Sequence, residues 1–295
     1  MPLNSPADKQ CNKIDSPAIK GVLYIVSTPL GNLEDITIRA INTLKSVDMI
    51  AAEDTRHTKK LLSHYGINTR LISCHEHNEN ERSSLFITKL NGGSSIALVT
   101  DAGTPSISDP GFRLVRNVLD EGISIVPVPG VSAAITALCV SGLSTDSFVF
   151  IGFLPRKKRR RIDHLTELID EKKTLIFYES PRRVFDCLEE IREIFGDRKA
   201  VLCREMTKIH EEFIRGNISE ILQTLSMREQ VKGECTLVIS GAETKKMSLG
   251  TLDDEIREKI LLRNISASAL AKELSVKYDI SKNEIYNKIL NIKNK

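Results

Sequence analysis

The sequence is poor in the features that several common protein classes require. It has no tryptophan, and aromatic residues make up 5% of its 295 residues, so an extended aromatic platform for stacking bases is not expected. Its six cysteines are widely scattered and form no C-x-x-C pair, which argues against zinc and thiol redox chemistry. Reduced thiols and a cytoplasmic location fit this pattern best.

The usual phosphate-binding and hydrolase motifs are also missing. There is no G-x-G and no GxxxxGK, so neither a dinucleotide-binding fingerprint nor a P-loop is present. The segment 130–134 ends in Ala134 where a nucleophile elbow needs glycine, and no HExxH helix occurs. His75-Glu-His77 could ligate a metal, but such a polar cluster is more often surface chemistry, so no metal is expected.

Long hydrophobic runs are absent as well. Apolar runs such as 96–100 and 133–140 are far shorter than the roughly 18 residues that span a bilayer. Residues 1–20 mix charges with prolines and lack the apolar stretch of a signal peptide. We therefore expect a loose tail over 1–20 and no membrane partner.

What is present from residue 21 onward is a regular alternation of short Val- and Ile-rich runs with amphipathic stretches, which predicts an α/β fold. We expect one α/β domain with a largely parallel sheet over 21–130. A second α/β domain with mixed strand directions is expected over 131–243. Residues 252–295 show only helical signals, and two of the predicted helices, 266–274 and 281–292, resemble a helix-turn-helix joined through 276–280.

The loops that follow the first five predicted strands combine Gly or Pro with Thr, Ser or Asp. Ligands of open α/β sheets lie beyond the carboxyl ends of the strands, so these loops are the expected binding site. Helix capping explains one such residue per loop, but not five consecutive strand ends of this character. The loops are 27–32, 53–56, 75–77, 101–106 and 127–132.

At this point eight motifs in fixed order carry a resemblance to a known family. The chain resembles the cytidine-2′-O-methyltransferases of small-subunit ribosomal RNA, a branch of the tetrapyrrole methylase superfamily, over residues 21–241. The motifs are TPLGN (28–32), AAEDTR (51–56), DAGTPSISDPG (101–111), PGVSA (129–133), GFLPRK (152–157), FYESPRR (177–183), CREMTK (203–208) and KGE (232–234).

The resemblance implies two α/β domains of tetrapyrrole-methylase type that bind S-adenosylmethionine in the cleft between them, usually as a homodimer. It also implies that the substrate is a decoding-region cytidine of 16S rRNA within the small ribosomal subunit. By superfamily analogy, the cofactor contacts would be Pro29, Ala102, Gly103, Thr104, Ile107, Ser132, Ala133, Tyr178, Met206 and Gly233.

Clustered cations provide a candidate RNA surface, although a charge run is often only a solvated loop. Six consecutive cations precede a helix predicted over 162–171, and further cations follow other predicted strands. Phosphate contacts of this kind give salt-dependent affinity. The candidates are Arg156, Lys157, Lys158, Arg159, Arg160, Arg161, Arg182, Arg183, Arg56 and His57.

Methyl transfer to a ribose hydroxyl mainly requires alignment of the acceptor with the donor, and a base would assist it. The candidates at the cleft edge are Asp101, Glu179, Glu205 and Lys208. Each also has a structural explanation: Asp101 could fix its own loop, and Glu205 could pair with Arg204 or Lys208.

Two alternatives stay open at this stage. A corrin or porphyrin methylase would share the cofactor cleft, but the basic run at 156–161 and the form of the loop at 101–111 argue against it. A nucleic-acid-binding factor that acts through the C-terminal helices would need degenerate α/β domains, and the complete set of cleft loops argues against that.

Overall fold

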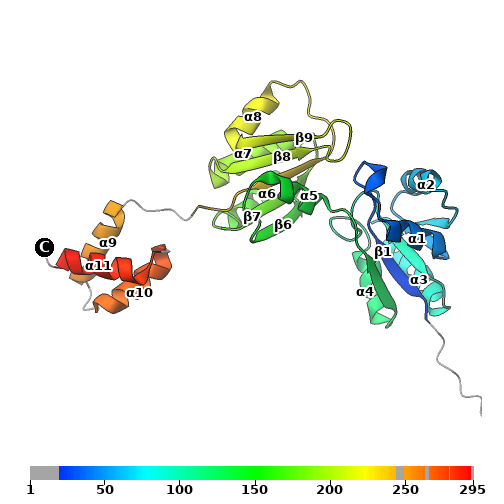
Figure 1. Ribbon diagram of the computed structural model, residues 1–295, viewed down its shortest axis with the longest axis horizontal. Helices are drawn as coiled ribbons and strands as arrows, with labels where there is room; N and C mark the ends of the chain where they lie inside the picture. Colours follow the sequence, from blue (N-terminus) through cyan, green and yellow to red (C-terminus); the bar gives the residue numbers. More distant parts are fainter. Residues whose placement is uncertain (1–19, 244–248, 263–265, 279, 294–295) are drawn as a thin grey trace, which may run out of the picture.

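The computed structural model describes residues 20–243, 249–262, 266–278 and 280–293. Two α/β units and a separate group of three helices follow one another along the chain (Figure 1). The expected tail over 1–20 lies outside the described residues, apart from Lys20.

The first unit is built on a five-stranded sheet in the order β3-β2-β4-β1-β5, and every neighbouring pair is parallel. The strands β2 and β4 are buried along their whole length, because helices cover both faces of the sheet. The predicted parallel sheet is therefore confirmed. Its strands are β1 (Val22–Val26), β2 (Met49–Ala52), β3 (Arg70–Ser73), β4 (Ile96–Val99) and β5 (Ser124–Val128).

Two buried clusters hold the helices of this unit against the two faces, one around Phe86 and the other around Leu44. Side-chain caps fix where the helices begin: Thr37 Oγ1 accepts from the N–H of Ala40, and Asp54 Oδ1 accepts from the N–H of Arg56. The helices are the short 3₁₀ helix η1 (Leu33–Asp35), α1 (Ile38–Ser46), α2 (Thr55–His64), α3 (Glu79–Asn91) and α4 (Phe112–Asp120).

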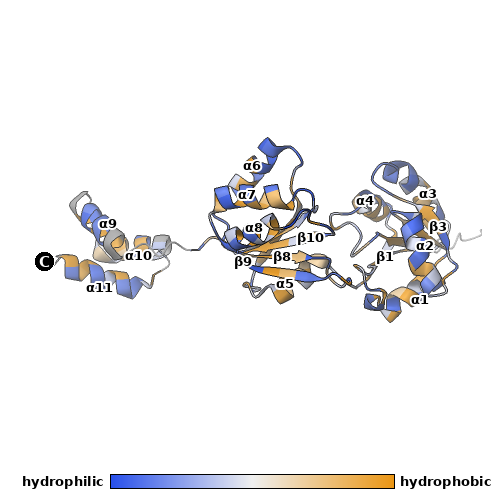
Figure 2. Cartoon of the chain, turned by 90° about the horizontal axis from the view of Figure 1, so that it is seen from above, coloured by the Kyte–Doolittle hydropathy of each residue, from blue (hydrophilic) through white to orange (hydrophobic). Residues whose placement is uncertain are grey.

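The second unit has a five-stranded sheet in the order β6-β7-β10-β8-β9, in which only β6 and β7 pair in parallel. This agrees with the mixed strand directions predicted from the short turns. In Figure 2 its strands β8 and β10 are hydrophobic, whereas blue hydrophilic surface lies on the helices around them. The strands are β6 (Phe148–Phe153), β7 (Thr174–Glu179), β8 (Lys199–Arg204), β9 (Glu212–Asn217) and β10 (Cys235–Ile239).

Helices cover both faces of the second sheet. On one face α5 packs Ala137 and Leu138 against Ile176 and Val238. On the other face the other three helices bury an aliphatic and aromatic cluster that includes Phe177. These helices are α5 (Ala133–Ser141), α6 (Lys158–Glu167), α7 (Val184–Phe195) and α8 (Ile218–Ser226).

Helix α6 begins four residues before the predicted position, so that part of the basic run forms its first turn. The reason is Arg161, which is 8% exposed and binds both carboxylate oxygens of Glu190 on α7, with an Nη2–Oε1 distance of 2.7 Å. Its Nη1 also donates to the carbonyl oxygens of Pro155 and Arg156. A buried bidentate pair of this kind anchors the helix start to α7.

The C-terminal part consists of α9 (Leu249–Leu262), α10 (Ala267–Tyr278) and α11 (Lys282–Lys293), which share one small core around Ile256, Leu274 and Ile289. Ion pairs Lys259–Glu273 and Lys288–Asp253 tie α9 to the other two helices. The predicted pair of helices is present, and α10 continues to Tyr278 instead of ending at 274. Among the described residues, no helix is long and apolar enough to cross a membrane.

Candidate functional site

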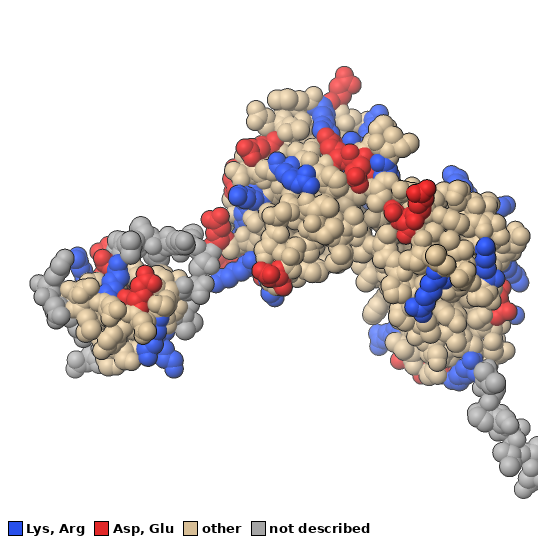
Figure 3. Space-filling view, in the orientation of Figure 1, with Lys and Arg blue, Asp and Glu red and all other residues tan. Residues whose placement is uncertain are grey.

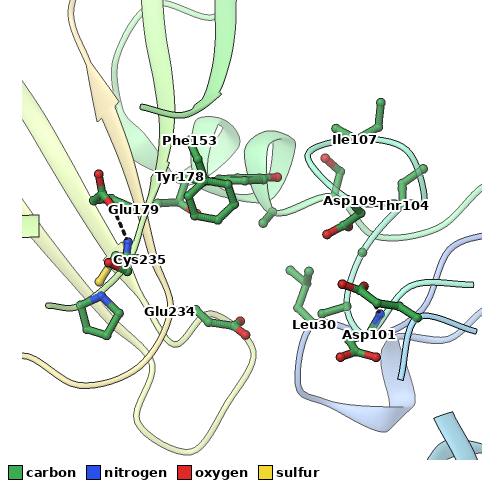
Figure 4. A pocket seen from close by; sticks show the side chains of 18 residues that line it. Leu30, Asp101, Thr104, Ile107, Asp109, Phe153, Tyr178, Glu179, Glu234 and Cys235 are labelled. Atoms are coloured by element: carbon green, nitrogen blue, oxygen red, sulfur yellow. Dashed lines mark hydrogen bonds between the residues drawn. The ribbon is translucent and has the colours of Figure 1, made fainter. Parts of the chain in front are cut away.

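A cavity of about 350 Å³ lies between the two sheets. One wall comes from loops that follow β1, β2, β4 and β5, and the opposite wall comes from the ends of β6 and β7 and the start of β10 (Figure 4). The lining residues are Leu30, Glu53, Asp101, Ala102, Gly103, Thr104, Ile107, Asp109, Ser132, Ala133, Phe153, Tyr178, Glu179, Ser180, Pro181, Glu234, Cys235 and Thr236.

Hydrogen bonds tie three loops of the first unit together at the cavity wall. Thr28 and Gly103 exchange two backbone hydrogen bonds of 2.8 and 2.9 Å. Thr104 Oγ1 lies 2.9 Å from Ser27 Oγ and donates to the carbonyl oxygen of Val131 at 3.1 Å. Because β1 lies between β4 and β5 in the sheet, the carboxyl ends of these three strands meet here, and the hydrogen bonds join their loops into one wall.

The loop after β4 has an unusual backbone. Gly103 has φ +91°, and the non-glycine residues Ser106 and Ser108 have φ +71° and +63°. Residues with side chains rarely adopt such angles, and strain of this kind collects at functional sites. Gly103 meets the requirement with no side chain, which leaves its backbone open to the cavity.

Tyr178 forms the centre of the opposite wall. Its hydroxyl accepts from the N–H of Ala134 at 3.1 Å, and its ring makes edge contacts with Phe150 and Phe153 at centroid distances of 5.0 and 5.6 Å. Met206 is buried in the cluster around it. Burial raises the pKa of Tyr178, so the ring is a neutral wall that links the second sheet to the start of α5.

Three carboxylates give the first wall its acidic character. Glu53 Oε2 accepts from Thr100 Oγ1 at 2.6 Å, and Asp101 Oδ1 accepts from the N–H of Asp54 at 3.2 Å. Burial, reinforced by Glu53, raises the pKa of Asp101, and the same causes raise the pKa of Asp109 to about 7. In the described part of the chain none of the three forms an ion pair with Lys or Arg.

The other predicted acid and base candidates are neutralised by partners. Glu179 is 2% exposed, and its Oε2 lies 3.1 Å from Nη2 of Arg183. Lys208 Nζ binds both Glu205 Oε1 at 3.0 Å and Glu234 Oε2 at 3.1 Å. The structural explanation of Glu205 by its pairing with Lys208 is therefore confirmed.

Three predicted cofactor contacts, Pro29, Met206 and Gly233, lie beside the cavity instead of on its lining. Pro29 is buried next to Leu30. Gly233 has φ +88° and packs against Glu205, which a Cβ at this position would approach to 2.2 Å. Seven of the ten predicted contacts line the cavity, namely Ala102, Gly103, Thr104, Ile107, Ser132, Ala133 and Tyr178.

The predicted basic surface needs one correction. Arg161 is buried against Glu190 as described above. Helical periodicity turns it toward α7, so this member of the basic run is not available to bind RNA. Arg183 is half-buried against Glu179, whereas Arg182 is exposed. Arg56 and His57 are exposed on α2, with Arg56 paired to its neighbour Asp54 at 2.7 Å. Five members of the run, residues 156–160, are exposed.

Sequence reasoning missed several lining residues, and it included one loop that does not reach the cavity. Glu53 and Asp109 lie within motifs already singled out, AAEDTR and DAGTPSISDPG, so their acidity was the available signal. Phe153 and Ser180 also lie within motifs, GFLPRK and FYESPRR, whereas Cys235 lies just outside the motif KGE and carried no signal. The loop 75–77 is absent from the lining because β3 is the edge strand farthest from β1 and β5.

The fold is that of one class of methylases. The family model for tetrapyrrole (corrin/porphyrin) methylases matches residues 22–222. A solved structure of diphthine synthase shares the fold with a TM-score of 0.58 at 14% identity, covering 75% of this chain and 90% of that chain. A uroporphyrin-III C-methyltransferase from Thermus thermophilus aligns with a TM-score of 0.52 at 19% identity, covering 75% and 93%.

Curated relatives identify a narrower family within this class. The protein named ribosomal RNA small subunit methyltransferase I from Halalkalibacterium halodurans is 47% identical over 274 residues, which cover 91% of this chain and 94% of that one. The protein of the same name from Escherichia coli O157:H7 is 46% identical, covering 90% and 94%. The chain belongs to the tetrapyrrole methylase family and, within it, to the family of ribosomal RNA small subunit methyltransferase I.

The chain is accordingly a methyltransferase whose cofactor is S-adenosyl-L-methionine, and the cavity fits that cofactor. Half-buried carboxylates without an ion-pair partner are unfavourable in their charged form, and burial accordingly raises the pKa of both Asp101 and Asp109. S-adenosylmethionine carries a sulfonium and an ammonium group, and these positive charges would stabilise the ionised carboxylates. The volume of about 350 Å³ is within the range of small-molecule sites.

Proposed function

We propose that the protein transfers a methyl group from S-adenosylmethionine to the 2′-hydroxyl of a cytidine in the decoding region of 16S rRNA, within the small ribosomal subunit. The observation that carries this proposal is an acidic interdomain cavity in a chain whose near-full-length relatives are named ribosomal RNA methyltransferases. The substrate comes from those names and from the motifs of the sequence.

In this proposal the cofactor lies in the cavity described above. The backbone of Ala102, Gly103 and Thr104 and the start of α5 at Ser132 and Ala133 hold it on one side. Ile107 and Tyr178 supply apolar contact on the two walls. Pro29, Met206 and Gly233 act from behind this lining by fixing the shape of Leu30, Tyr178 and Glu234.

When bound, the cofactor supplies an electrophilic methyl group, so the protein needs to bind, align and desolvate the reactants. A proton leaves the ribose hydroxyl as the new bond forms. Asp101 and Asp109 are the lining acids best suited to accept it, because both lack an ion-pair partner among the described residues, while Glu179, Glu205 and Lys208 are paired. A pKa of about 7 for Asp109 matches the pH at which a general base works well.

The first turn of α6 and the segment before it form the proposed RNA surface. Four exposed cations, Lys157 to Arg160, lie at the helix N-terminus, where the helix dipole already makes positive charge unfavourable. RNA phosphates would relieve that repulsion. The proposed surface consists of Arg156, Lys157, Lys158, Arg159, Arg160 and Arg182, with Arg56 and His57 on the other unit and Arg183 held by Glu179.

Cationic and acidic side chains are interspersed on the face shown in Figure 3, and no single basic surface covers either α/β unit there. Local clusters, and not a general field, would therefore guide the RNA. This arrangement favours a folded substrate, such as a ribosomal subunit, that meets several clusters at once.

Three further parts of the proposal concern organisation. The chain would divide into domains 21–130 and 131–243 with a helical module over 252–295, since α5 already packs on the second sheet.

The protein would act in the cytoplasm as a homodimer. The exposed apolar side chains of Phe112 and Leu119, two turns apart on α4, are candidates for the interface. Light scattering of wild type and of Phe112→Asp tests the dimer.

The function itself is tested by transfer of labelled methyl groups from S-adenosylmethionine to undermethylated small ribosomal subunits, with naked 16S rRNA and a uroporphyrin acceptor alongside. The proposal expects label in the rRNA of the subunits. Label in the porphyrin alone would overturn it.

A further inference from the structure

A second cavity, of about 770 Å³ and open to solvent, lies between the two α/β units. One side is the loop after β1 with the end of α2, and the other side is the loop between β8 and β9. Its lining residues are Gly31, Asn32, Leu33, Glu34, His64, Glu205, Thr207, Lys208, Ile209 and His210. We call it the outer groove.

The outer groove shares a wall with the cofactor cavity. Leu30 lines the cofactor cavity, and the next residue, Gly31, lines the groove. Glu234 lines the cofactor cavity, and its Oε2 accepts from Nζ of Lys208, which lines the groove, at 3.1 Å. An acceptor oxygen must come within about 3–3.5 Å of the methyl group, and a nucleotide in the outer groove would lie directly beside the cofactor cavity.

The loop between β8 and β9 holds Ile209 out into solvent. Glu205 and Thr207 have φ +50° and +66°, angles that are strained for a β-branched residue such as Thr207. The loop is nonetheless held: the N–H of Thr207 donates to Glu211 Oε1 at 2.7 Å, and Thr207 Oγ1 accepts from the N–H of Asn32 at 3.2 Å. Ile209 is 97% exposed.

An isoleucine in that position contributes no burial to the fold, so neither its exposure nor the backbone strain is explained by stability. Leu33, on the first unit, lines the same groove and is 36% exposed. Two aliphatic side chains from the two units thus border one groove, and Asn32 and His210 add hydrogen-bonding groups beside them.

A line of basic side chains on α2 leads to the groove. Arg56, Lys60 and His64 are spaced by four residues, which places them on one face of the helix, and all three are exposed. His64 is part of the groove lining. Phosphates that follow this face would bring a nucleic-acid strand to the groove.

We propose that the outer groove receives the acceptor nucleotide in an unpaired state, with its base held between Ile209 and Leu33 and its backbone along the cationic face of α2. This inference rests on the proposed function. Aliphatic side chains are known to act as wedges at unstacked nucleotides, and an enzyme that needs a buried nucleotide atom extrudes that nucleotide from its stack. Aliphatic contact also suits a chain that has no tryptophan.

The test compares Ile209→Ala with Met227→Ala, a matched loss of an apolar side chain that is 79% exposed and lies on neither cavity. Both residues are exposed, so both variants should fold. The substrates are undermethylated small ribosomal subunits and labelled S-adenosylmethionine, and calorimetry gives the affinity for the cofactor alone. We expect Ile209→Ala to lower kcat/KM for the subunits about tenfold or more, as the loss of a buried aliphatic contact would, with the affinity for S-adenosylmethionine unchanged and Met227→Ala behaving as wild type.

A further variant, Lys60→Gln, should weaken subunit binding and flatten its dependence on salt. Equal kcat/KM for Ile209→Ala and Met227→Ala, with an active wild type, would overturn the inference and leave the proposed function intact. Loss of cofactor affinity in Ile209→Ala would also overturn it, because the loop would then support the cofactor cavity instead. A wild type that binds the cofactor but methylates no subunit would refute the proposed function itself.

Discussion

We expect Asp109 to make the binding of S-adenosylmethionine depend on pH near neutrality. Burial, reinforced by Glu53, raises the pKa of this carboxyl to about 7, so the free protein carries it partly protonated. A cationic ligand binds the ionised form, and the proton must therefore leave before or during binding. Affinity should fall as the pH drops below 7 and level off above it.

The magnitude follows from the ionised fraction. With a pKa of about 7, the ionised fraction falls from about three quarters at pH 7.5 to about 3% at pH 5.5, which corresponds to a loss of roughly 25-fold in affinity. The same shift means that the free folded protein binds an extra proton between the ordinary carboxyl pKa and pH 7. Raising the pH through this window therefore lowers the stability contributed by Asp109 in the free protein.

Isothermal calorimetry over this pH range, repeated in buffers of different ionisation enthalpy, measures both the affinity and the proton released. Asp109→Asn is the matched variant, since it keeps the shape of the side chain and has no charge to titrate. Its affinity for S-adenosylmethionine should be nearly flat with pH and equal to or below that of wild type at pH 7.5. A wild-type affinity that is flat from pH 5.5 to 7.5, without proton release, would refute the reasoning.

Three other predictions concern the rest of the structure. Gly103→Val forces a β-branched side chain into φ +91° at the cavity wall and should weaken S-adenosylmethionine binding by about tenfold or more. The control Gly196→Val, at φ +80° with open space around it, should not weaken binding. Equal affinities of the two variants by calorimetry would count against the assigned wall. Glu190→Gln leaves Arg161 without its buried carboxylate and should cost about 3–5 kcal/mol of unfolding free energy in urea titration; a loss below 1 kcal/mol would show that the pair does not anchor α6. Arg160→Gln should reduce the slope of subunit affinity against salt concentration by about one phosphate contact, and an unchanged slope would remove this residue from the RNA surface.

The binding loops of the first sheet could be predicted from the sequence because the residues that mark them directly follow each strand in the chain. Turn residues after each strand, such as the segment 27–32 after β1, mark the carboxyl ends that a parallel sheet brings to one edge. Seven of the predicted cofactor contacts line the cavity for this reason. The strand order, by contrast, depends on packing, so the exclusion of the loop 75–77 follows only from the edge position of β3.

The environments of the charged residues were the hardest to predict, because a run of charges in the sequence does not show which side chains will be buried or paired. Arg161 belongs to the same run as Arg160, but helical periodicity turns it inward to meet Glu190, 29 residues further along the chain. Asp109 and Asp101 share one motif, and burial together with the neighbouring Glu53, which comes from another motif, raises the pKa of both. Tertiary contacts of this kind leave no signal in a single sequence.

The position of the transferred methyl group decides between methylation of a ribose and any other reaction. Undermethylated small ribosomal subunits would be incubated with the protein and labelled S-adenosylmethionine, and the digested 16S rRNA would be analysed by mass spectrometry. The account predicts the label on the ribose of a cytidine from the decoding region. A label on a base or on another RNA, or no transfer by a protein that binds the cofactor, would contradict it.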